Sequence, residues 1–103
     1  MPLFIMATKL NGEDTRSNGL RLEEKEGNVV RGIKEAKLSV EWVANYAIMG
    51  PYDYIDVFRV PDNETAMKVS TLVRGLGHAH TEIWGAMEWH RFKDMLAELP
   101  EAA

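Results

Sequence analysis

His78, His80 and Glu82 are the residues of this 103-residue chain whose spacing most resembles a metal-binding set. Alternate residues of a β-strand point to the same face at intervals of about 7 Å, so two imidazoles and a carboxylate would share one side of a strand. Two histidines and a carboxylate can bind zinc or ferrous iron. A third ligand that far along a straight strand is normally too distant. We therefore favour the alternative that they are polar residues near the start of an edge strand.

Two carboxylates, Asp53 and Asp56, suggest acid–base chemistry. A carboxylate taken out of water has a raised pKa and can exchange protons near neutral pH. Asp53 lies beside the Gly50-Pro51 turn and is expected to hydrogen-bond the backbone of the hairpin. Asp56 is expected to enter a cavity or a subunit interface, and pairing in the interface, with an arginine for example, is the favoured alternative.

Aromatic side chains offer a third possibility, a pocket for a small hydrophobic ligand. The favoured alternative is packing in the core and in a dimer interface. The sequence contains no phosphate-binding glycine loop, no nucleophile elbow and no helical metal motif, so no cofactor is expected. The candidate ligand-binding residues are Trp42, Tyr46, Tyr54, Phe58 and Trp84.

The composition is that of one ordinary globular domain over residues 1–103, with 46% hydrophobic and 27% charged residues. A formal net charge of −4 argues against a nucleic-acid partner. No apolar run approaches the roughly 20 residues of a membrane-spanning helix, so no membrane association is expected. The absence of cysteine excludes disulfides and thiolate ligands and favours a reducing cytoplasm.

The apolar pattern predicts four strands. Consecutive apolar residues mark the first strand, and two β-rich segments flank Gly50-Pro51 as an antiparallel hairpin. Alternation marks the fourth strand. The predicted ranges are 2–10, 40–49, 52–60 and 78–88.

The helical pattern covers residues 20–38, in one bent helix or two short ones, and a second helix that follows Asp62. Asp62 is the expected N-cap, and Gly77 the expected left-handed stop. The charged run 23–26 is interpreted as a solvated helix face. A short terminal helix is expected as an extension over about 89–99.

The order strand, helix, strand, strand, helix, strand predicts an α+β, ferredoxin-like fold, with both helices on one face of a four-stranded antiparallel sheet. We expect Trp42, Tyr46, Tyr54 and Phe58 on the open face, with Asp56 among them, and Ile55 and Val57 on the other face. Monomeric proteins avoid so large an exposed apolar patch. The sequence therefore predicts a homodimer, or a higher homo-oligomer, that pairs through the open face.

Three segments of the chain resemble the GYD-domain family, named for its Gly-Tyr-Asp signature. They are Gly50-Pro51-Tyr52-Asp53, Val60-Pro61-Asp62-Asn63-Glu64 and Gly75-Leu76-Gly77. The resemblance covers roughly residues 2 to 90 and implies a dimeric α/β-barrel. Members are largely of unknown function, so the resemblance supplies no catalytic residues, and the pair His78 and His80 looks particular to this chain.

We therefore expect a small cytoplasmic homo-oligomer that binds a small molecule at or near the sheet interface. One alternative is an enzyme of the dimeric α/β-barrel monooxygenase or isomerase type, by analogy of fold, with Asp56, Tyr54, His78 and His80 as candidate catalytic residues. A further alternative is a structural or regulatory assembly module. The sequence leaves open whether the protein is an enzyme.

Overall fold

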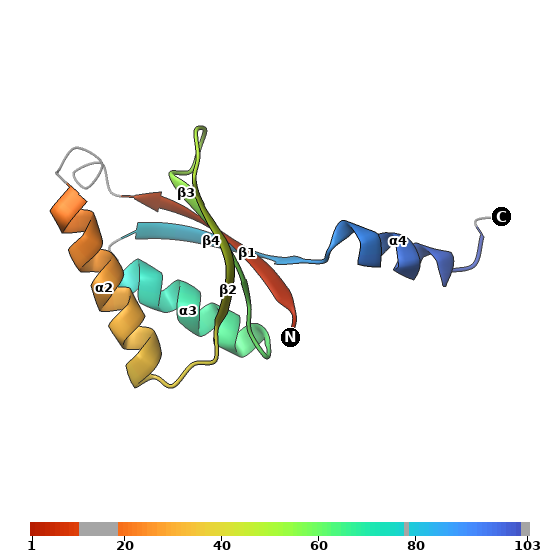
Figure 1. The fold of residues 1–103 in the computed structure, drawn as a ribbon, viewed down its shortest axis with the longest axis horizontal. Coiled ribbons are helices and arrows are strands. Elements are labelled where there is room, and N and C mark those ends of the chain that lie inside the picture. The colour runs from red at the N-terminus through yellow and green to blue at the C-terminus, as the bar shows by residue number, and fades with distance from the viewer. Residues whose placement is uncertain (11–18, 78, 102–103) are drawn as a thin grey trace.

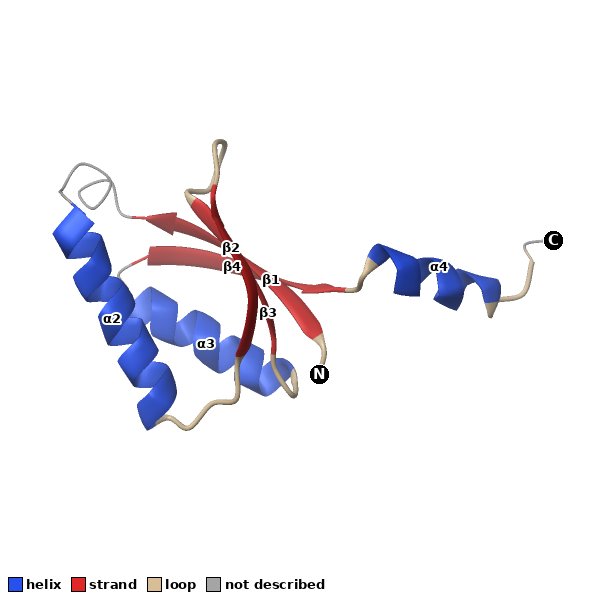
Figure 2. Ribbon diagram, in the orientation of Figure 1, coloured by secondary structure: helices blue, strands red, loops and turns tan. Residues whose placement is uncertain are grey.

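The computed structural model describes residues 1–10, 19–77 and 79–101. The four strands form one antiparallel sheet in the order β2-β3-β1-β4, and α2 and α3 cover one of its faces (Figures 1 and 2). None of the described helices is long and apolar enough to cross a membrane. The elements are β1 (Leu3–Leu10), α2 (Gly19–Glu35), β2 (Glu41–Ala47), β3 (Tyr54–Arg59), α3 (Asn63–Leu76), β4 (Ala79–Ala86) and α4 (Trp89–Ala97).

These elements confirm the predicted α+β, ferredoxin-like fold. The first predicted helix is one continuous helix, α2. The terminal helix α4 lies within the range expected for it, and it stands apart from the sheet and the other helices (Figure 1).

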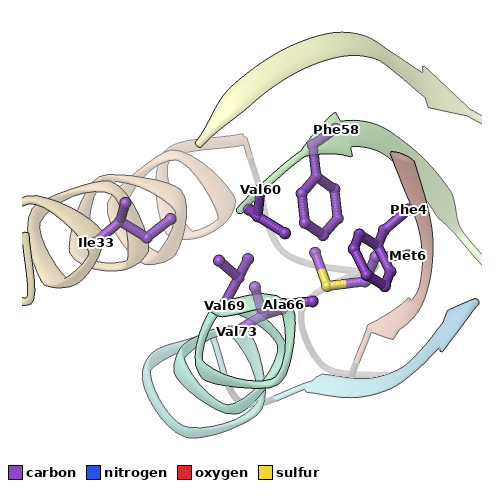
Figure 3. Close-up of a cluster of buried hydrophobic side chains, with 8 residues drawn as sticks. All are labelled: Phe4, Met6, Ile33, Phe58, Val60, Ala66, Val69 and Val73. Carbon is purple, nitrogen blue, oxygen red and sulfur yellow. The ribbon is translucent and has the colours of Figure 1, made fainter. Parts of the chain in front are cut away.

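The hydrophobic core lies between the central strands and α3 (Figure 3). The register places Phe4 of β1 opposite Phe58 of β3, and their rings stack with centroids 6.1 Å apart. Burial of one such side chain is worth about 1.5–3 kcal/mol. The clustered side chains are Phe4, Met6, Ile33, Phe58, Val60, Ala66, Val69 and Val73.

The prediction that Tyr54, Asp56 and Phe58 lie on the open face is wrong. Phe58 is 0% exposed, and Asp56 pairs in register with the buried Met6, on the side of the helices. The reason is that β3 runs directly into α3, so that Val60 and Phe58 must point beneath that helix. The two-residue period of a strand then carries Asp56 and Tyr54 to the same side.

The face assignment of β2 is also corrected. Trp42 lies opposite Phe58, with ring centroids 5.4 Å apart, and therefore faces the helices. A β-bulge between Trp42 and Ala44 shifts the alternation, so that Tyr46 lies opposite Ile55, on the open face. The open face remains apolar, but with other residues than expected. Its larger apolar side chains include Ile5, Tyr46, Ile55, Val57 and Trp84.

The ends of α3 confirm one prediction and correct another. Asp62 is the N-cap: its Oδ1 accepts hydrogen bonds from the Thr65 amide at 2.8 Å and the Thr65 hydroxyl at 2.7 Å. These bonds hold the pKa of Asp62 below its usual range. Gly77 is not left-handed, since its φ is −90°. Glycine is needed there because a Cβ atom would lie 2.6 Å from the carbonyl oxygen of Val73.

We expect Phe58→Ala to lower the free energy of unfolding by about 3–5 kcal/mol, because it opens a cavity in the core. Urea denaturation followed by circular dichroism measures this loss. Met67→Ala is the control, since Met67 is 65% exposed on α3 and should change stability by no more than about 0.5 kcal/mol. Equal effects of the two substitutions would contradict the assignment of Phe58 to the core.

Candidate functional site

A cavity of about 610 Å³ lies between α2 and the sheet. Leu22, Val29 and Ile33 of α2 form one wall, and Met6 and Trp42 form part of the wall contributed by β1 and β2. Volumes of about 300–1,000 Å³ with mostly apolar walls are typical of sites for small molecules. The cavity is therefore large enough to hold a small organic ligand.

Three polar side chains of the sheet converge in this apolar wall. Tyr54 and Asp56 are alternate residues of β3 and both line the cavity. Asn45 of β2 lies directly opposite Asp56 in the register, and its Nδ2 donates a hydrogen bond to Asp56 Oδ1. The expected pairing of Asp56 with an arginine in a subunit interface is not what this chain shows, because the carboxyl group already pairs with Asn45 inside the cavity.

Asp56 is a buried acid, 9% exposed. Burial raises its pKa above the ordinary value, the hydrogen bond from Asn45 opposes that rise, and the negative charge of Glu26 adds to it. The group therefore holds a proton to higher pH than a solvated aspartate. When protonated, it can donate as well as accept a hydrogen bond.

The phenol of Tyr54 is also perturbed. Burial raises its pKa, the neighbouring hydroxyl of Thr8 opposes this, and the carboxylates of Asp56, Glu26 and Asp53 raise the pKa further. The hydroxyl group therefore stays protonated throughout the neutral range. It adds a second hydrogen-bonding group to the sheet side of the cavity.

Asp53 supports the loop between β2 and β3. Its Oδ2 accepts a hydrogen bond from the Leu10 amide at 2.7 Å and lies 3.8 Å from Lys9 Nζ. Its backbone carbonyl accepts a bond from the Ile48 amide at 2.9 Å, which closes the hairpin loop. The carboxylate thus ties the loop to β1, whereas the sequence suggested that it would bond the hairpin itself.

The structure separates the five aromatic residues proposed for ligand binding. Trp42 and Tyr54 line the cavity from the helix side of the sheet. Tyr46 also contributes to the lining, although the register of the edge strand β2 places it opposite Ile55 of the open face. Phe58 belongs to the core instead. Trp84 lies on the open face of the sheet, where Tyr52 packs against it edge to face with centroids 6.4 Å apart.

The proposed metal ligands do not form a recognisable site in the described part of the chain. His78 lies outside the described residues. His80 and Glu82 are exposed on β4, opposite Lys9 and Ala7 of β1. No group of three or more histidine, aspartate or glutamate residues suited to a metal ion occurs among the residues that the structure describes.

The sequence did not identify Lys25, Glu26 and Asn45 as site residues, although all three line the cavity. The charged run was interpreted as solvated, which holds for its three glutamates, Glu23, Glu24 and Glu26, all exposed, whereas Lys25 is half-buried. The signal for Glu26 is its helical spacing, three residues before the cavity-lining Val29 and four after Leu22. The sequence contained no corresponding signal for Asn45.

Two solved structures share the fold. The leucine response regulatory protein LrpA of Mycobacterium tuberculosis has a TM-score of 0.55 at 10% identity over 84% of this chain, which spans only 51% of that protein. TTHA0845 of Thermus thermophilus has a TM-score of 0.52 at 21% identity, over 85% of this chain and 95% of its own. At these identities the likeness establishes the fold alone.

No protein of the curated set matches the chain in sequence. The profile of the GYD domain, in contrast, matches residues 4–96. This range includes all of β1 except Leu3, the other three strands, the helix α2 that forms the cavity wall, and most of α4. The chain therefore belongs to the GYD domain family.

Proposed function

We propose that this protein binds a small molecule with an apolar body and one polar group in the cavity between α2 and the sheet. The observation that carries the proposal is a largely apolar cavity of about 610 Å³ into which Asn45, Tyr54 and Asp56 converge. A few placed polar groups in an apolar concavity are the usual features of such sites. The cavity is on the helix side of the sheet, not at the open face that the sequence favoured.

The charges around the cavity restrict the ligand. Glu26, Asp53 and Asp56 bring three carboxyl groups to its lining, and Lys25 brings one amine. A carboxylate on the ligand would face like charges, which costs free energy. The cavity therefore suits a neutral ligand or a cationic one, with a hydroxyl or amine group that hydrogen-bonds to Asp56 and Tyr54.

Catalysis is a second candidate function, favoured by the raised pKa of Asp56. A buried acid in a cavity is a common general acid or base, because its pKa then lies closer to the working pH. Tyr54, the other candidate from β3, lines the same cavity, whereas His80 lies outside it. The class of reaction that such a pair could assist is proton transfer at a bound substrate.

The cavity can be tested with the neutral dye Nile red, whose fluorescence rises in apolar surroundings. Ala47→Trp should weaken dye binding at least tenfold, because Ala47 lines the cavity. Ala44→Trp is the matched control on the opposite side of the same strand, and it should leave the affinity unchanged. Equal behaviour of the two variants would place the dye elsewhere and contradict the proposal.

The restriction on ligand charge can be tested by displacement of the dye. We expect 2-phenylethylamine to displace it at a concentration at least tenfold lower than 3-phenylpropanoate does, because the carboxylate meets Glu26 and Asp56. Glu26→Gln should narrow this difference, while Glu23→Gln, on the exposed side of α2, should not. Preference for the carboxylate would show that the carboxyl groups do not select the ligand.

The buried acid predicts a pH dependence of stability. Because the pKa of Asp56 is raised in the folded state, its stabilising contribution is complete below the unfolded value and is lost as pH rises through the folded pKa. Asp56→Asn should therefore be more stable than the wild type at pH 7. The advantage should shrink as pH falls toward the usual value of 3.8.

Asp62→Asn is the control of opposite sign, and urea denaturation at several pH values measures both variants. The pKa of Asp62 is lowered, so its contribution is present above the unfolded value and is lost as pH falls. Asp62→Asn should thus show no gain in stability at pH 7. A pH-independent effect of Asp56→Asn would mean that this carboxyl group is not perturbed by burial.

A further inference from the structure

The hydrogen bond to Asp56 determines which part of this acid a ligand meets. Its Oδ1 accepts the amide hydrogen bond of Asn45, which lies opposite it on the neighbouring strand β2. The side chain as a whole lines the cavity. Oδ2 is therefore the oxygen that is available to a ligand, and the neutral amide beside it holds the carboxyl group in one orientation.

Aromatic side chains flank Asp56 along the helix side of the sheet. The register places Trp42 opposite Phe58, one position of this face before Asp56, and Tyr54 is one position after it. Such positions are about 7 Å apart along a strand. Trp42 and Tyr54 both line the cavity. Because the face of an aromatic ring attracts cations within about 6 Å, these rings favour a positive charge at Asp56 over a neutral group of the same size.

Helix α2 adds a negative charge on the other side of the cavity. Glu26 is exposed and lines the cavity, so it lies at the opening. Its charge raises the pKa of both Asp56 and Tyr54, which means that it acts on this part of the sheet. Lys25 also lines the cavity, but the charge of α2 that raises both pKa values is that of Glu26. A cation at Asp56 would thus lie between two carboxyl groups.

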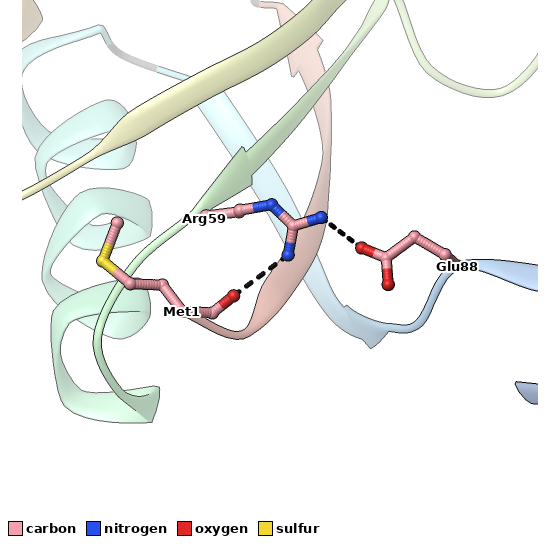
Figure 4. Close-up of polar contacts among 3 residues, drawn as sticks. All are labelled: Met1, Arg59 and Glu88. Atoms are coloured by element: carbon pink, nitrogen blue, oxygen red, sulfur yellow. Dashed lines mark hydrogen bonds and ion pairs between the residues drawn. The ribbon is translucent and has the colours of Figure 1, made fainter. Parts of the chain in front are cut away.

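The basic residues of the strands are engaged away from Asp56. Arg59, at the end of β3, lies on the open face and forms an ion pair with Glu88 (Figure 4). Lys9 Nζ lies 3.8 Å from Asp53 Oδ2. Lys9 and Arg59 are the only lysine and arginine of the four strands. Neither of them neutralises Asp56, so a bound cation would supply the charge that this carboxylate lacks.

We infer that the cavity binds a primary amine as its ammonium ion, held at Asp56 Oδ2 in exchange for the proton of this acid. The ammonium group of a primary amine has three N–H donors. Asp56, Tyr54 and Glu26 bring three oxygen acceptors to the cavity from the sheet and from α2. The exchange balances in charge, because the acid releases its proton to water and the carboxylate that remains pairs with the ammonium ion. The inference rests on the proposed function, since it names the ligand class of the same cavity.

Asn45 is a positioning residue in this arrangement. Its hydrogen bond lowers the pKa of Asp56, whereas burial and the charge of Glu26 raise it. Asn45 thereby helps to set the pH above which the acid gives up its proton. Among the described residues, β1 and α3 contribute only apolar side chains to the lining. The other titratable side chains that line the cavity are Lys25, Tyr46, Asp53 and Tyr54.

The first test compares 2-phenylethylamine with 2-phenylethanol, which has the same body and a neutral polar group, in displacement of Nile red at pH 8. The amine should bind at least tenfold more tightly, and Asp56→Asn should bring the ratio of the two affinities close to one. Asp62→Asn, the same substitution at the exposed N-cap of α3, should keep the wild-type ratio. Equal affinities in the wild type, or a ratio that Asp56→Asn does not change, would overturn the inference.

The N,N,N-trimethyl derivative of 2-phenylethylamine tests the hydrogen bonds separately from the charge. It has the same charge and no N–H donor, so it should bind at least fivefold more weakly than the primary amine. Equal binding would show that charge and aromatic rings alone hold the cation. That result would rule out recognition of a primary amine by the three oxygen atoms.

Titration calorimetry measures the exchanged proton without the dye. Near the folded-state pKa of Asp56, binding of the amine should release a proton, which makes the measured heat depend on the ionisation enthalpy of the buffer. The alcohol should show no such dependence. The affinity for the amine should fall as pH falls through this pKa, because an acid that keeps its proton bears no charge. Binding of the amine without proton release between pH 4 and pH 8 would contradict the exchange.

Two variants should move the midpoint of this pH profile in opposite directions. Asn45→Ala removes the hydrogen bond that lowers the pKa of Asp56, so the midpoint should move to higher pH. Glu26→Gln removes a charge that raises this pKa, so the midpoint should move to lower pH. Glu23→Gln, exposed on the same helix, is the control and should leave it in place. If Asn45→Ala changes the affinity equally at every pH, Asn45 serves packing alone.

The outcomes distinguish this inference from the proposed function. If Nile red binds and Ala47→Trp weakens it, but the amine and the alcohol displace it equally, the cavity is a ligand site and only the ligand class is wrong. If neither the dye nor the amine binds, both proposals are wrong.

Discussion

The packing of Phe58 and Val60 beneath α3 is the constraint on which the rest of this structure depends. Once these two side chains point to the helices, the alternation of β3 sends Asp56 and Tyr54 to the same side. That part of the sheet faces α2, and between them is the cavity. A buried acid next to an apolar cavity is thus a direct consequence of how the core is formed. The core and the candidate site cannot be changed independently along this strand.

Local signals made the elements predictable from the sequence, whereas the faces of the strands needed tertiary information. The N-cap Asp62 and the Gly50 turn act within a few residues, and both are where the sequence placed them. In β3, however, the residues on each face of the strand include both apolar side chains and one charge, which is Asp56 on one face and Arg59 on the other. The hydrophobic pattern alone therefore does not decide which face of β3 is buried. The deciding fact is the position of α3, which lies outside the strand.

The candidate site was predictable to the extent that it lies on β3. Asp56 and Tyr54 stood out as polar groups in an apolar strand, and both line the cavity. Glu26 and Asn45 did not stand out, because their role depends on where α2 and β2 lie relative to β3. The bulge in β2 had no sequence signal either, and it decides that Trp42 and Tyr46 face different sides. The site residues that the sequence did not predict therefore depend on how elements distant in the sequence pack together.

Two features of this chain oppose its stability in water. A carboxyl group at Asp56 costs free energy of desolvation that an apolar side chain would not. An uncovered amphipathic helix and an apolar open face cost free energy in water as well. Sequences retain such local conflicts mainly where they serve a function. Asn45 of β2 stabilises the buried acid by its hydrogen bond.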